Sequence, residues 1–137
     1  MTRLPAFVLR ASLFVLASLA GSTAWAGAGC AARHPSPQQL DAAAATALRA
    51  VDALEAADAS VALIARVGTD LSKQGLVYSH AGFVLRDHPD GRWTVVHLLN
   101  ECGSDRSGLY AQGLVDFFSD DLVNQDLRIV WFTPDVA

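Results

Sequence analysis

The chain has 137 residues, 52% of them hydrophobic, and its 10 Lys and Arg against 14 Asp and Glu give a formal net charge of −4. This length suits a single domain. The acidic balance and the lack of a basic stripe argue against nucleic acid or an anionic membrane surface as a partner, because both require clustered positive charge.

Residues 1–26 have the layout of a secretory signal peptide. Arg3 and Arg10 flank a short start that precedes an apolar run over 11–20, and Ala24 and Ala26 place small residues at the positions that determine cleavage. The run is about half the roughly twenty residues that a membrane-spanning helix needs. We therefore expect cleavage after Ala26, no transmembrane anchor, and a periplasmic or secreted protein. Lipidation at Cys30 is the weaker alternative, since the segment before it lacks the usual leucine.

The first helix is predicted over residues 36–58. Ser36 provides a cap, Pro37 occupies the first helical position, and Gln39 stands where a capping box requires it. Apolar residues then recur every three or four positions, which predicts a buried stripe. The stripe comprises Leu40, Ala44, Ala47, Leu48, Val51 and Leu54.

Four strands are expected after this helix. Residues 60–67 are apolar at nearly every position, which favours a strand covered on both faces. The strands 76–86 and 93–100 flank a proline- and glycine-containing turn at 88–91, so they are predicted to form a hairpin. The last strand is expected over 127–132.

The segment between the hairpin and the last strand has helical spacing over residues 109–118, although its glycines weaken the prediction. The resulting pattern is one α+β domain over residues 27–137, with an N-terminal helix packed on a small, largely antiparallel sheet. The aromatic residues are expected in its core: Tyr78, Phe83, Trp93, Phe117, Phe118, Trp131 and Phe132.

The hairpin carries the candidate site, because residues 78–102 hold three of the four histidines and one of the two cysteines. Side chains alternate along a strand. A four-residue loop would put His80 and His97 on one face, directly opposite or one diagonal step apart, with Cβ atoms at roughly 5 to 8 Å. A five-residue loop would put them on opposite faces.

Two histidines on one face suit three roles. One imidazole can accept a proton from a cysteine thiol while the other fixes its orientation. Alternatively, the pair could bind a metal, with further ligands from His88, Glu101 or Cys102, although these lie in a turn or past a strand end. The third role is purely structural. We expect His80 and His97 to be catalytic-type residues, with no metal and no cofactor.

The cysteines leave two readings open. An oxidising compartment would allow Cys30 and Cys102 to form a disulfide, whereas Cys102 could also be a buried thiol. Cys102 is a poor nucleophile for His80, since it lies five residues after His97, near the end of the same strand.

The hairpin also resembles a known group of enzymes. The motif SHAG (79–82), followed by an apolar strand, a turn and VVHL (95–98), is similar to the histidine-containing half of circularly permuted, NlpC-type papain-like hydrolases. This resemblance implies a papain-like fold, with His80 as general base and His97 as the orienting group. It also implies a nucleophilic cysteine at a later helix start, which this sequence does not contain.

Three longer segments resemble the bacterial domain-of-unknown-function family 2145: VALIARVGTDLS (61–72), YSHAGF (78–83) and NECGSDRSGLYAQGLVDFF (100–118). Members of that family are expected to be longer, so the chain is expected to lack the C-terminal part of the family fold.

The resemblances imply an exported cysteine hydrolase or acyltransferase that acts on amide or ester bonds, with the nucleophile absent and the chain alone inactive. The alternative is a non-catalytic periplasmic domain that binds a peptide, glycan or lipid of the cell envelope. The sequence leaves open whether the protein is an enzyme.

Overall fold

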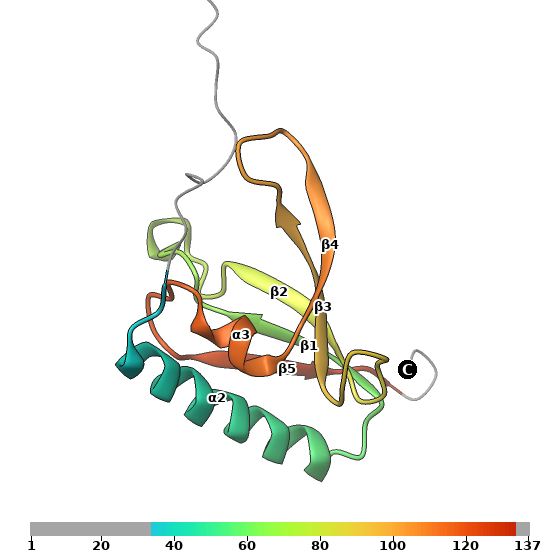
Figure 1. Ribbon diagram of the computed structural model, residues 1–137. Coiled ribbons are helices and arrows are strands. Elements are labelled where there is room, and N and C mark those ends of the chain that lie inside the picture. Colours follow the sequence, from blue (N-terminus) through green and yellow to red (C-terminus); the bar gives the residue numbers. More distant parts are fainter. Residues whose placement is uncertain (1–33, 134–137) are drawn as a thin grey trace, which may run out of the picture.

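Two helices cover one face of a five-stranded sheet in the computed structural model, which describes residues 34–133 (Figure 1). The strands follow the order β4-β3-β2-β1-β5, and all neighbours are antiparallel. The predicted α+β arrangement, with an N-terminal helix on an antiparallel sheet, is confirmed. The elements are α2 (Pro37–Ala56), β1 (Val61–Arg66), η1 (Ser72–Gln74), β2 (His80–Leu85), β3 (Thr94–Asn100), β4 (Ser107–Gln112), α3 (Leu114–Ser119) and β5 (Leu127–Trp131).

Helix α2 begins at the predicted capping box. The Ser36 hydroxyl accepts a hydrogen bond from the Gln39 amide at 3.2 Å, and the Gln39 side chain accepts one from the Ser36 amide at 2.8 Å. The predicted buried stripe is partly wrong, because Leu48 is 66% exposed and Leu40 is exposed as well. Small residues line most of the contact and allow the helix to lie close to the core. The buried residues are Ala43, Thr46, Ala47, Ala50 and Leu54.

Strand β1 is buried on one face only, which corrects the prediction of a strand covered on both faces. Ala62, Ile64 and Arg66 are buried, and the residues between them are only partly covered. The apolar run therefore reflects a sheet whose outer face is also apolar. Phe83, on that face, is 51% exposed and stacks on Phe132 with ring centroids 6.0 Å apart.

The hairpin strands are shorter than predicted. Strand β2 starts at His80, since residues 76–79 form a loop rather than the start of a strand. Of the aromatic residues expected in the core, Trp93, Phe117 and Phe118 are buried. Phe83 and Trp131 are exposed, which is a further correction, and Tyr78 and Phe132 are partly buried.

The predicted helix over 109–118 is wrong in its first half. Residues Ser107–Gln112 form β4, which pairs with β3 along its whole length, and only Leu114–Ser119 is helical. The turn at residues 101–106 folds the chain back onto β3, so interstrand hydrogen bonds override the helical spacing of the apolar residues.

Glu55 attaches the β2–β3 connection to helix α2. Its carboxylate accepts two hydrogen bonds from Arg92, at 2.7 and 2.8 Å, and one from the indole N–H of Trp93 at 2.7 Å. The bonds from Arg92 and Trp93 lower the pKa of Glu55 to about 2. The hairpin is thus fixed to the helix at its turn end, opposite the end that carries the histidines.

None of the helices between residues 34 and 133 combines the length and the apolar character needed to cross a membrane.

Gly82 is required where β2 passes β3. It lies one step beyond the last recorded pair, Phe83 with Val96, and therefore faces His97. A Cβ atom at Gly82 would lie 2.8 Å from Val95 Cγ1 and 2.9 Å from His97 Cβ. The close approach of the two strands thus depends on the missing side chain.

Replacing Gly82 by Ala is expected to destabilise the fold by about 1–3 kcal/mol, because the added methyl group overpacks the strand contact. Urea unfolding monitored by circular dichroism measures the change in the free energy of unfolding. Gly113→Ala is the matched control, since a Cβ there meets nothing within 4 Å and its φ of −66° suits any residue. Equal stability of the two variants would contradict the role given to Gly82.

Candidate functional site

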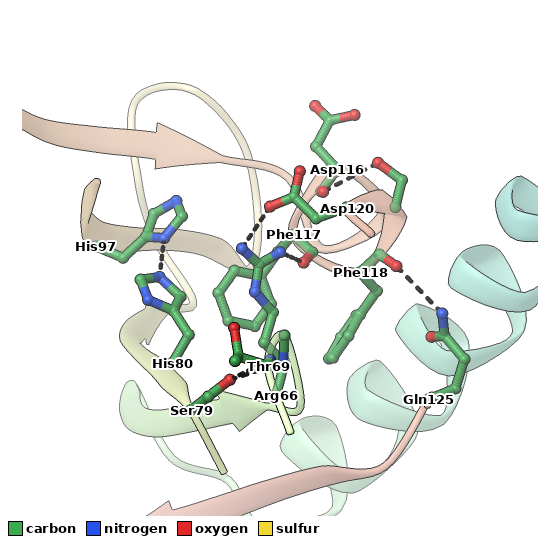
Figure 2. Close-up of polar contacts among 12 residues, drawn as sticks. Arg66, Thr69, Ser79, His80, His97, Asp116, Phe117, Phe118, Asp120 and Gln125 are labelled. Carbon is green, nitrogen blue, oxygen red and sulfur yellow. Dashed lines mark hydrogen bonds and ion pairs between the residues drawn. The ribbon is translucent and has the colours of Figure 1, made fainter. Parts of the chain in front are cut away.

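The hairpin brings His80 and His97 into direct contact. Nε2 of His80 lies 2.7 Å from Nδ1 of His97, and the ring centroids are 5.0 Å apart (Figure 2). The register pairs Leu85 with Thr94 and Phe83 with Val96, which corresponds to an even loop. Of the alternatives left open by the sequence, the structure therefore has both histidines on one face, one diagonal step apart.

The imidazole pair lies at the edge of the hydrophobic core. His97 is 3% exposed, whereas His80 is partly exposed. The ring of Phe117 from α3 packs against both, with centroids 6.0 Å from His80 and 5.4 Å from His97. Helix α3 thus holds the two rings against the sheet.

Arg66 is a site residue that the sequence analysis missed. It is 5% exposed, pairs with His80 across β1 and β2, and donates hydrogen bonds to the Phe117 carbonyl and the Asp120 carboxylate (Figure 2). Its guanidinium carbon also lies 4.6 Å from the centre of the Phe117 ring. A lone charge inside the apolar run of residues 60–67 was the available signal, because a buried arginine needs partners.

Burial and Arg66 keep the two imidazoles neutral. Burial is the main cause that lowers the pKa of His80, and the positive charges of Arg66 and His97 lower it further, while Asp120 opposes them. Burial also lowers the pKa of His97, against the raising effects of Gln112 and Asp120. Both pKa values lie below the ordinary 6.5. At neutral pH one ring therefore donates to the other, and Nδ1 of His80 makes no hydrogen bond to any residue between 34 and 133.

Ser79, next to His80, has a structural role. Its hydroxyl oxygen accepts hydrogen bonds from the amides of Gly68 and Thr69, both at 2.8 Å, and its own amide donates to the Arg66 carbonyl at 3.2 Å. These bonds fasten the loop after β1 to the start of β2 and so fix where His80 begins its strand.

The metal site considered from the sequence is not assembled. Within residues 34–133 no group of three or more His, Cys, Asp and Glu side chains is arranged to hold a metal ion. His88 lies in the turn, where its Nδ1 accepts a hydrogen bond from the Asp90 amide at 3.1 Å. The alternative ligands His88, Glu101 and Cys102 therefore do not complete a set with the histidine pair.

Cys102 is disulfide-bonded, so it is not a free thiol, and this agrees with its dismissal as a nucleophile. Its predicted partner Cys30 lies outside the described residues, as does the predicted signal peptide.

Acid is expected to destabilise the protein through the histidine pair. Because the folded-state pKa of each histidine lies below 6.5, the unfolded chain binds more protons than the folded chain. The contribution of the pair to the free energy of unfolding is therefore fully present above pH 6.5 and is lost as the pH falls through the folded pKa values. Urea unfolding at about pH 7.5 and about pH 5 measures this loss, which His97→Gln should reduce. His34→Gln, at an exposed position, should leave it unchanged. The same pH dependence in wild type and His97→Gln would refute the assignment.

Among the comparisons with known proteins, only a match to a sequence-family model assigns the chain to a family. No curated protein and no solved structure matches it. A family model described as an uncharacterized protein conserved in bacteria (DUF2145) matches residues 53–137, which include every strand and the histidine pair. The match covers more than half of the sequence. The chain therefore belongs to the DUF2145 family.

Proposed function

We propose that the chain carries the general base of a papain-like cysteine hydrolase or acyltransferase that acts on amide or ester bonds. His80 is the base and His97 the group that orients it. The observation that supports this most strongly is the 2.7 Å contact between Nε2 of His80 and Nδ1 of His97, which leaves the other nitrogen of His80 for a reacting group. A base held by a second polar side chain is the arrangement that nucleophilic catalysis requires.

The protonation state suits this role. An imidazole whose pKa is lowered by burial is neutral at neutral pH and can accept a proton. In the proposed reaction, the proton of a thiol moves to Nδ1 of His80 while sulfur forms a bond to the carbonyl carbon. The bond to the amine or alcohol then breaks, and His80 returns the proton to that leaving group. Water or another acceptor releases the acyl group in a second step.

No described residue is assigned as the nucleophile. Cys102 is disulfide-bonded, and the hydroxyl of Ser79 is engaged with two backbone amides. The sequence holds no cysteine other than Cys102 and its predicted partner Cys30, so the proposal requires a thiol from outside this chain, and the chain alone is expected to be a poor catalyst. The proposed setting is the periplasm or the cell exterior, which rests on residues 1–26 of the sequence.

A non-catalytic domain that binds a cell-envelope peptide, glycan or lipid is the second candidate. It is favoured by the apolar face of the sheet opposite the helices, where Phe83, Leu98 and Val130 are exposed. Such a face suits contact with a partner more than with water.

The base assignment predicts that His80→Ala lowers thiol-dependent cleavage of an ester by about 10²- to 10⁴-fold, the usual contribution of a general base. The measurement is release of nitrophenol from an acyl ester when the purified chain and a small thiol are supplied together, at a thiol concentration that mass spectrometry shows to leave the Cys102 disulfide intact. His88→Ala is the control, since that histidine lies in the turn and should leave the rate unchanged.

Two outcomes would count against the enzyme. Equal rates for His80→Ala and wild type would exclude His80 as the base. A wild-type rate no faster than the thiol alone, together with saturable binding of an envelope peptide or glycan, would favour the binding domain.

A further inference from the structure

The contact between His80 and His97 is compatible with two arrangements of hydrogen atoms. Nε2 of His80 can donate to Nδ1 of His97, or the reverse, and the 2.7 Å distance suits both. In the first arrangement the open Nδ1 of His80 has a lone pair and is a base. In the second it carries a hydrogen and is an acid. Something else must select between them.

Strand β4 supplies a side chain at the far nitrogen of His97. The register pairs His97 with Tyr110 and Val95 with Gln112, which places Gln112 one diagonal step from His97 on the same face of the sheet. Nε2 of His97 and Oε1 of Gln112 are both buried, and neither has a hydrogen-bond partner among residues 34–133.

Two buried polar atoms without other partners are costly unless they satisfy each other. A carbonyl oxygen can only accept, so Oε1 of Gln112 satisfies Nε2 of His97 only when that nitrogen carries the hydrogen. The Gln112 amide also raises the pKa of His97, the direction expected of an acceptor on a ring N–H.

From this juxtaposition we infer that Gln112 is a positioning residue that fixes the tautomer of both histidines. Its side-chain oxygen accepts from Nε2 of His97, so Nδ1 of His97 must accept from Nε2 of His80. Nδ1 of His80 is then left without a hydrogen. The hydrogen bonds run from His80 to His97 and from His97 to Gln112. Through them, Gln112 makes Nδ1 of His80 a base without touching it.

The other groups around His97 do not compete for this role. The two terminal nitrogens of Arg66 from β1 are bonded to the Phe117 carbonyl and the Asp120 carboxylate. Its Nε is buried and has no hydrogen-bond partner among residues 34–133, and as a donor it cannot accept the hydrogen of Nε2 of His97. Phe117 offers only its ring and an already engaged carbonyl. The remaining titratable neighbour is His80 from β2, which is the ring being oriented.

The tautomer assignment holds whether or not the protein is an enzyme. Its consequence for catalysis rests on the proposed function.

The test is ¹⁵N NMR of the histidine rings at about pH 8, where both imidazoles are neutral. In the wild-type chain, Nε2 of His80 and of His97 should show the shift of a nitrogen that carries hydrogen, and both Nδ1 atoms the shift of one that does not. Gln112→Leu removes the acceptor and should move these shifts toward averaged or reversed values. Gln112→Glu keeps an acceptor, so it should retain the wild-type pattern and raise the pKa of His97.

Gln74→Leu is the matched control, because it makes the same chemical change at an exposed position of η1. A hydrogen on Nδ1 of His80 in wild type, or an unchanged pattern in folded Gln112→Leu, would overturn the inference. Should Gln112→Leu fail to fold, the wild-type spectrum and the Gln112→Glu variant decide.

The ester assay separates the two proposals. Altered ring shifts in Gln112→Leu, with no thiol-dependent turnover by wild type, would support the tautomer assignment and count against the enzyme. Turnover that depends on His80, with unchanged ring shifts in Gln112→Leu, would support the enzyme and count against the tautomer assignment.

Discussion

The register of β2 against β3 is the constraint on which the candidate site depends. An even number of residues in the connection puts His80 and His97 on the same, buried face, and a shift of one residue would separate them. The register is held at the turn end by the hydrogen bonds of Glu55 and at the histidine end by the close strand approach at Gly82. The contacts that pack the hairpin therefore also determine the geometry of the imidazole pair.

The charged residues around the pair act in opposite directions. Arg66 favours neutral imidazoles and Asp120 favours charged ones, and their direct bond keeps both at fixed positions beside the rings. Because Arg66 also binds the Phe117 carbonyl, the same side chain locates the aromatic ring that covers the histidines. A buried arginine is costly unless it is paired, so this arrangement links the fold of α3 to the protonation of the site.

Local features of the sequence predicted those parts of the structure that depend on near neighbours. The capping box at Ser36 and the hairpin turn rely on residues a few positions apart. The hairpin singled out both histidines, but strand alternation left open whether they share a face, because that depends on the length of the loop. The helix over 109–118 was wrong because pairing with β3 decides the structure of β4. Arg66 and Gln112 reach the site from other strands, so no local pattern could place them beside His97.

An NMR titration of the two histidines tests the central claim most directly, namely that His80 and His97 form a buried, neutral pair whose open nitrogen is basic. The ring Cε1–H resonances, followed from about pH 8 to about pH 4, report both groups individually. The structure predicts that His80 and His97 titrate below 6.5 and that protonation of one shifts the other. Independent titration of either ring at or above 6.5 would contradict it.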